Sequence, residues 1–260
     1  MHSARVSHLV LISIVAVAAT GVLAGVGTTL PPVAQQREAP LHGSRQVLIV
    51  VTDDWNAVAG MLQRFGRETA GGPWTPVGSR AAVVVGRSGL AWGRGVADDA
   101  ASGGPVKREG DGKAPAGVFR LGTSFGQSRQ PLPGVALPYR SLDGNVECVD
   151  DVRSEHYNTL LARQEVGRVD WSSSERMWTE PLYEWGIVVQ HNAPDVTAGA
   201  GSCIFLHVWK GAGAGTAGCT AMDGQQLTHV IQWLQPASRP LLVQLPQAEY
   251  ERLQAAWDLP

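Results

Sequence analysis

The sequence has few cysteines and little charge of either sign. Three cysteines among 260 residues are too few for a fold held together by disulfides, and the odd count leaves at least one thiol without a partner in the chain. Charged residues make up 17% of the chain and the formal net charge is -2, so the chain lacks the basic field that nucleic-acid binding needs. We therefore expect no nucleic-acid partner. The 44% hydrophobic content predicts a globular domain with one sizeable core.

A long stretch near the N-terminus carries no charge at all. No Asp, Glu, Lys or Arg lies between Arg5 and Arg37, and residues 9–27 are apolar with only small polar interruptions. A single Arg before such a run is typical of a segment that directs export of the rest of the chain. We interpret residues 1–27 as a signal peptide or an N-terminal membrane anchor, residues 28–41 as a Pro- and Gln-rich linker, and residues 42–260 as the folded domain. A buried core helix is the alternative for residues 9–27.

Short β-branched runs bounded by Gly, Pro or Asn predict a mainly β fold with a few short helices. The runs are residues 46–52, 81–85, 117–121, 186–190, 204–209 and 241–245. Helical periodicity follows Asp223, a potential N-cap, and again follows Pro246. The polar segments 98–111 and 150–176 are long enough to carry function.

The residues best suited to chemistry lie between Gly201 and Asp223. Period-two alternation places Cys203, Phe205, His207 and Trp209 on one strand face, and a glycine-rich loop then leads to Cys219. A histidine facing such a loop suits a Cys/His pair, in which the imidazole removes the thiol proton and the thiolate attacks a carbonyl. The backbone N–H groups of Gly218, Cys219 and Thr220 are candidates for stabilising the resulting oxyanion.

Three other interpretations use the same residues. Gly213, Gly215 and Gly218 have dinucleotide-loop spacing, but the motif closes the chain instead of opening a βαβ series. Cys203, His207 and Cys219, with His191 or His229, are residue types that bind zinc, although they lack the close paired spacing of structural zinc sites. A buried structural cysteine beside a hydrogen-bonded histidine is the third interpretation. We expect neither a metal nor a cofactor.

His207 followed by the Thr216-Ala217-Gly218-Cys219 segment resembles the active-site signature of the L,D-transpeptidase catalytic domain family (YkuD/ErfK-like). Residues 113–119, KAPAGVF, resemble that family's Thr-Pro-x-Gly-x-Phe segment. The resemblance covers roughly residues 46–245. It implies an L,D-transpeptidase-like β-sandwich catalytic domain, Cys219 as nucleophile, His207 as base and oxyanion donors around Gly218. It also implies peptidoglycan stem peptides as substrates, outside the cytoplasmic membrane: in the periplasm, cell wall or extracellular space.

The chain departs from the family pattern in ways that indicate a divergent branch. Ala217 stands where many members have a second histidine, and Thr220-Ala221 replaces an apolar residue followed by Arg or Asn. Without that Arg, Lys107, Arg108 and Lys210 are candidates for orienting the donor carboxylate, although solvated surface charge is the simpler interpretation of each. Thr216, Thr220 and His191 are candidate substrate-binding residues.

The outcome of the reaction and the cysteine pairing depend on this interpretation. The function we expect is a cell-wall cysteine acyltransferase acting as a monomer; the alternatives are an L,D-carboxypeptidase or amidase that uses water as acceptor, and a catalytically silent wall-binding module. With Cys219 reserved for chemistry in an oxidising compartment, Cys148 and Cys203 are the expected disulfide, and Cys203 with Cys219 is the competing pair.

Overall fold

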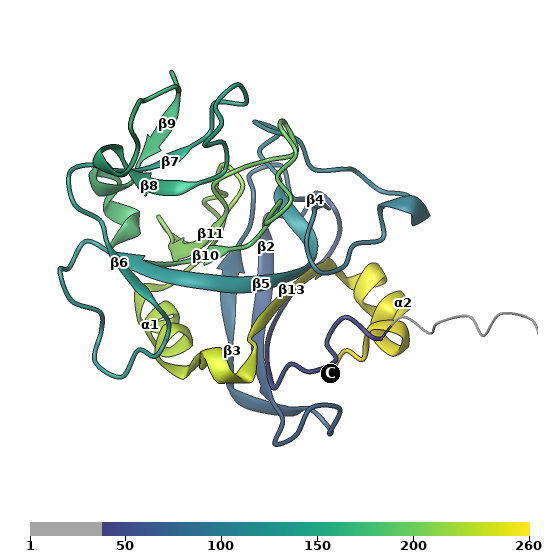
Figure 1. Ribbon diagram of the computed structural model, residues 1–260. Coiled ribbons are helices and arrows are strands. Elements are labelled where there is room, and N and C mark those ends of the chain that lie inside the picture. Colours follow the sequence, from purple (N-terminus) through teal and green to yellow (C-terminus); the bar gives the residue numbers. More distant parts are fainter. Residues whose placement is uncertain (1–37) are drawn as a thin grey trace, which may run out of the picture. The chain divides into compact units, whose positions relative to one another are not determined.

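The main sheet of this protein closes on itself. The computed structural model describes residues 38–260, which contain a sheet whose strands are hydrogen-bonded in the order β10-β11-β12-β3-β2-β1-β13-β5. Strand β5 also pairs with β10, so the path returns to its start and forms a barrel (Figure 1). The barrel strands are β1 (Gln46–Thr52), β2 (Ala59–Gly66), β3 (Thr75–Val84), β5 (Ala114–Gly126), β10 (Trp185–Val189), β11 (Phe205–Val208), β12 (Thr220–Met222) and β13 (Leu241–Pro246).

The mainly β prediction is confirmed, and the pairing of β5 explains why the main sheet is a barrel. Strand β5 is long enough to pair along part of its length with β13 and along another part with β10. Two short strands, β4 (Leu90–Trp92) and β6 (Tyr139–Ser141), also pair with β5. One closed sheet therefore encloses the larger apolar core.

A second, three-stranded sheet contains β7 (Val146–Val149), β8 (Leu160–Ala162) and β9 (Ser174–Arg176), in the order β8-β7-β9. In the view of Figure 1 it lies above β10 and β11. A smaller apolar cluster, which includes Phe125, Cys148, Phe205 and Cys219, joins this sheet to the barrel.

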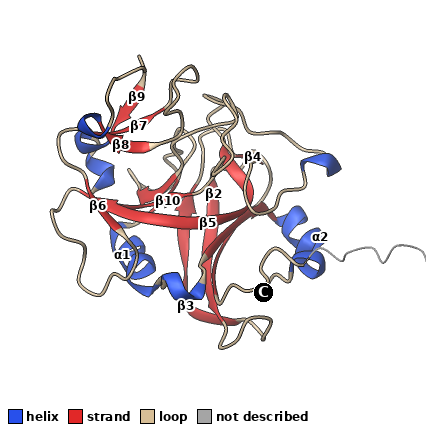
Figure 2. Ribbon diagram, in the orientation of Figure 1, coloured by secondary structure: helices blue, strands red, loops and turns tan. Residues whose placement is uncertain are grey.

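Helices are few (Figure 2). Helix α1 (Gly224–Trp233) starts at the predicted cap, where the Asp223 carboxylate accepts hydrogen bonds from the N–H groups of Gln225 and Gln226. It packs on β10 and β11, whereas α2 (Gln247–Trp257) packs on β13 and β1. Single 3-10 turns are η1 (Ala100–Ser102), η2 (Arg163–Glu165), η3 (Met177–Thr179), η4 (Pro181–Tyr183) and η5 (Pro236–Ser238).

The last residue of the predicted linker, Leu41, packs with the folded domain. Leu41, assigned to the linker, is fully buried, and its carbonyl accepts a hydrogen bond of 2.6 Å from the Arg67 guanidinium. Hydrophobic burial thus draws the end of the predicted linker into the core. The predicted signal or anchor, and the linker as far as Arg37, lie outside the described residues. Among the residues that are described, no helix has the length and apolarity needed to cross a membrane.

Candidate active site

A cavity of about 530 Å³ opens between the barrel and the small sheet. Both polar segments singled out in the sequence contribute to its wall, with Lys107 and Glu109 from the first and Asp150 and Glu175 from the second. The strand β11 and the glycine-rich loop supply the rest of the reactive wall, including His207 and residues 214–219. The cavity therefore brings together residues 107–110, 150–183 and 202–221, which are far apart in the sequence.

Cys219 lies at the end of the glycine-rich loop, one residue before β12. Its sulfur accepts a hydrogen bond from the Phe205 N–H at 3.3 Å, and the thiol donates to the Cys203 carbonyl at 3.5 Å. Burial raises the pKa of the Cys219 thiol well above its ordinary value, and the nearby Glu175 carboxylate adds to the increase. The resting sulfur is therefore a neutral thiol in an apolar setting.

His207 lies on β11 and faces the same cavity as Cys219. Strands β11 and β12 are parallel, and His207 pairs with Ala221, two residues beyond Cys219 and on the same face. The Nδ1 atom lies 2.7 Å from the Val208 carbonyl, which can only accept, so Nδ1 carries the proton and Nε2 is left as the acceptor. Burial lowers the pKa of His207, which keeps the imidazole neutral. Among the described residues, no hydrogen bond joins His207 directly to Cys219.

Tyr183 and Glu175 form a part of the site that the sequence did not predict. The Tyr183 hydroxyl donates to Glu175, and the Tyr183 ring meets the His207 ring edge-on with centroids 5.1 Å apart. Burial raises the pKa of Glu175 to about 7, and the negative charges of Asp150 and Glu180 act in the same direction. The many carboxylates between Asp150 and Glu184 were the sequence feature that could have indicated this part of the site. The local sequence does not show that they face Cys219.

Contrary to the sequence-based expectation, the N–H group of Gly218 is not free to bind an oxyanion. The Gly218 N–H donates to the Thr216 hydroxyl at 3.1 Å, and that hydroxyl donates to the Cys219 carbonyl at 2.7 Å. Thr216 lines the cavity, but its hydroxyl is used to close the turn. In the part of the chain that the structure describes, no acceptor is bound by the Cys219 N–H. Cys219 itself, in place of Gly218, therefore offers the free donor.

Two of the predicted substrate-binding residues lie away from the cavity. Thr220 is buried, and its hydroxyl donates to the Gln244 side chain at 2.6 Å. His191 is held between the Arg94 N–H and the Ala200 carbonyl, and burial lowers its pKa to about 4. Both side chains point into the protein interior, where their polar atoms have hydrogen-bond partners. The sequence does not reveal which way these two side chains point, and neither lines the cavity.

The positions of the other two cysteines argue against the zinc interpretation. Cys148 and Cys203 form the expected disulfide, which leaves Cys219 as the free thiol and removes Cys203 from any set of zinc ligands. Within residues 38–260, no three His, Cys, Asp or Glu side chains gather as a metal site would require.

Gly218 leads into β12 and not into a helix, so the dinucleotide loop is absent there. Arg108 and Lys210 are exposed, as surface charges should be, whereas Lys107 is buried.

Comparisons of the chain with protein-family models, with curated proteins and with solved structures found no match. A function for the cavity therefore has to be argued from its own residues and from the short motif around His207 and Cys219.

Proposed function

We propose that this protein is an exported cysteine acyltransferase of the cell wall, with L,D-transpeptidase-like chemistry on peptidoglycan stem peptides. One observation carries the proposal: the free thiol of Cys219 and the neutral imidazole of His207 line one cavity. The finer fold assignment, an L,D-transpeptidase-like β-sandwich, belongs to the same proposal. It is supported by the motifs around His207 and Cys219, whereas the main sheet itself closes as a barrel.

The chemistry follows from the proton positions. His207 Nε2 takes the proton of the Cys219 thiol, and the sulfur attacks the carbonyl carbon of a stem-peptide amide. As the C–S bond forms, an electron pair moves to the carbonyl oxygen, which the Cys219 N–H can bind. Collapse of this adduct expels the amine, which takes the proton from His207. An acceptor amine then attacks the thioester carbonyl, and its proton passes to His207. The C–S bond breaks as the amide forms, and the proton returns from His207 to the Cys219 sulfur. Water as acceptor would make the enzyme an L,D-carboxypeptidase or amidase.

The charge in the cavity wall supports a substrate that contains a diamino acid. Asp150 and Glu180 both line the cavity, and carboxylates there suit the ammonium group of such a residue. The cavity volume of about 530 Å³ falls within the range of sites that take small ligands.

Burial of the Cys219 thiol favours a second candidate, a catalytically silent wall-binding module. Such a module has no need for a thiol that ionises readily, and burial makes ionisation of this thiol unfavourable.

Acylation by a carbapenem separates the two candidates. To acylate the cysteine, the strained amide carbonyl of this β-lactam needs a nucleophile, a base and an oxyanion donor in the correct relative positions. Iodoacetamide needs only an accessible thiolate. After incubation with the carbapenem, and in parallel with stem tetrapeptide, intact-mass analysis should show one added acyl group. The adduct should be lost in Cys219→Ala and strongly reduced in His207→Ala. Alkylation of Cys219 without any carbapenem or peptide adduct would reject the acyltransferase and favour the silent module.

A further inference from the structure

Lys107 is a buried cation in the cavity wall to which the proposed reaction gives no role. Only 4% of its side chain is exposed. Its Nζ donates to Asp111 Oδ1 and to the Arg108 carbonyl, both at 2.7 Å. An ammonium group has three N–H donors, and within residues 38–260 the third has no acceptor. Because burying a charge is costly, a lysine kept in this place needs a physical reason.

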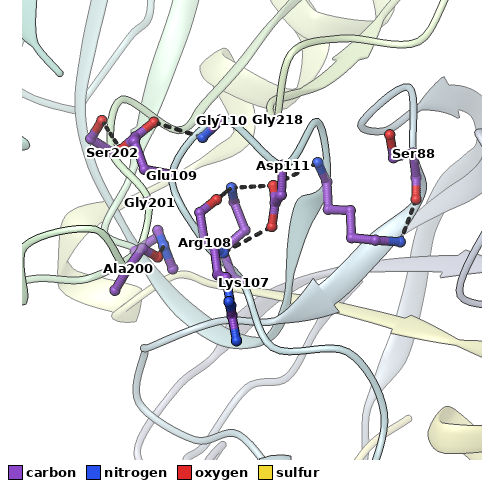
Figure 3. Close-up of polar contacts among 12 residues, drawn as sticks. Ser88, Lys107, Arg108, Glu109, Gly110, Asp111, Ala200, Gly201, Ser202 and Gly218 are labelled. Carbon is purple, nitrogen blue, oxygen red and sulfur yellow. Dashed lines mark hydrogen bonds and ion pairs between the residues drawn. The ribbon is translucent and has the colours of Figure 1, made fainter.

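The Lys107 side chain lies between Gly201 and Gly218, beside the nucleophile. A Cβ on Gly201 would lie 3.2 Å from both Cγ and Cε of Lys107, and Gly201 has a φ of +100° that favours glycine. On the other side, a Cβ on Gly218 would lie 4.0 Å from Lys107 Nζ. Figure 3 shows the ion pair of Lys107 and Asp111 between the segments of Gly201 and Gly218. The ammonium thus reaches the residue that precedes Cys219.

The segment that carries Lys107 is held in place at several points. Asp111 accepts hydrogen bonds from the Arg108 N–H at 2.8 Å and from the Lys113 N–H at 2.9 Å. Glu109 accepts a hydrogen bond from the Ser202 hydroxyl at 2.7 Å (Figure 3). The Lys107 charge is therefore fixed, unlike that of the exposed Lys210 on the same cavity.

We propose that Lys107 is the fixed positive charge that stabilises the anion formed at Cys219, first as thiolate and then as the oxyanion of the adduct. The inference rests on the proposed function in one respect, that Cys219 is the nucleophile. Burial and the Glu175 charge raise the pKa of the Cys219 thiol, whereas the Lys107 charge lowers it. A cation fixed in a low-dielectric wall interacts more strongly with such an anion than a solvated one would.

The test is the rate at which iodoacetamide alkylates Cys219 in the full-length protein at pH 8. In Lys107→Gln the rate should fall about five- to tenfold, since a nearby opposite charge shifts a pKa by about one unit or more. Lys107→Arg should restore most of the rate. Arg108→Gln removes the same charge from the exposed neighbouring residue and should leave the rate within about twofold. An unchanged rate in a Lys107→Gln variant that melts normally would overturn the inference.

A second variant makes the electrostatic potential at Cys219 more positive instead of less positive. Asp111→Asn removes the negative partner of Lys107 while keeping an oxygen acceptor, so alkylation should become faster. A rate equal to or below that of the unmodified protein would contradict the role of Lys107, even if Lys107→Gln fails to fold. Alkylation needs no substrate, so these results are independent of whether the carbapenem or the stem peptide acylates Cys219.

Discussion

Burial makes the reactive residues of the cavity neutral at rest. It raises the pKa of Cys219, lowers that of His207 and raises that of Glu175 to about 7. A thiol, a neutral imidazole and a carboxyl that is about half protonated near pH 7 repel one another less than their ionised forms would. Attack on a substrate carbonyl then creates negative charge in this buried site, where a fixed cation has its largest effect.

Glu175 predicts a specific dependence of stability on pH. A folded-state pKa of about 7, raised by burial from an ordinary 4.5, favours the protonated form in the folded protein. This contribution is fully present below about pH 4.5 and is lost as the pH rises through 7. Glu175→Gln keeps an acceptor for Tyr183 and cannot ionise, so its free energy of unfolding should exceed that of the unmodified protein at pH 8, by up to about 3 kcal/mol.

Urea unfolding at pH 4.5 and pH 8 measures the difference. The advantage of Glu175→Gln should shrink or disappear at the lower pH, and the same change at the exposed Glu184 should alter stability little at either pH. An equal effect of Glu175→Gln at both pH values would show that its carboxyl does not carry the raised pKa.

At the scale of elements, the small sheet is held against the barrel through the disulfide. Cys148 lies on β7 and Cys203 lies just before β11, 55 residues apart in sequence. The same sheet supplies Glu175, and the segment after β7 supplies Asp150 to the cavity. The part of the cavity wall that Asp150 and Glu175 form therefore depends on this covalent attachment.

Removing the disulfide should weaken both the fold and the site. Closing a loop of 55 residues is worth about 4 kcal/mol in the chain-entropy account, so Cys148→Ala with Cys203→Ala should lower the free energy of unfolding by roughly that amount. Denaturant unfolding measures this loss, with Cys219→Ala as the single-thiol control. Non-reducing peptide mapping provides a separate check: a Cys203–Cys219 bridge in protein that forms the acyl adduct would contradict both the pairing and the nucleophile.

At the scale of the whole molecule, a polar contact crosses the closed barrel. Strands β12 and β13 are not neighbours in the sheet, yet the Thr220 hydroxyl donates to the Gln244 side chain at 2.6 Å. Gln244 in turn donates to the Pro115 carbonyl on β5 at 2.9 Å. These bonds satisfy buried polar atoms across the barrel and tie the strand that follows Cys219 to the opposite wall.

Gln244→Leu should destabilise the whole barrel. It leaves the Thr220 hydroxyl and the Pro115 carbonyl without that partner, and unsatisfied buried groups cost about 1–3 kcal/mol each. We expect the free energy of unfolding to fall by about 3 kcal/mol, and the additional change Thr220→Val to recover part of the loss. Gln225→Leu, at an exposed position of α1, is the matched control. A fully additive loss in the double variant would show that the two side chains are not coupled.

Local pattern was enough to predict much of the secondary structure. The run 46–52 is strand β1 with the same bounds, and the Asp223 cap starts α1 as expected. Strand β2 was missed because AGMLQRFG has no β-branched residue, and β12 because three residues carry no measurable pattern. Both exist because neighbouring strands supply their hydrogen-bond partners.

The sequence by itself determined the strand-rich composition, the cysteine left without a partner and the pairing of His207 with a glycine-rich loop, because these depend on residue type and short spacing. The tertiary structure decided that the sheet closes, that Thr220 and His191 turn inward, and that Lys107, Glu175 and Tyr183 meet at the cavity around Cys219. Those outcomes depend on contacts between residues far apart in the chain, where burial and the need to pair buried polar groups outweigh local preference.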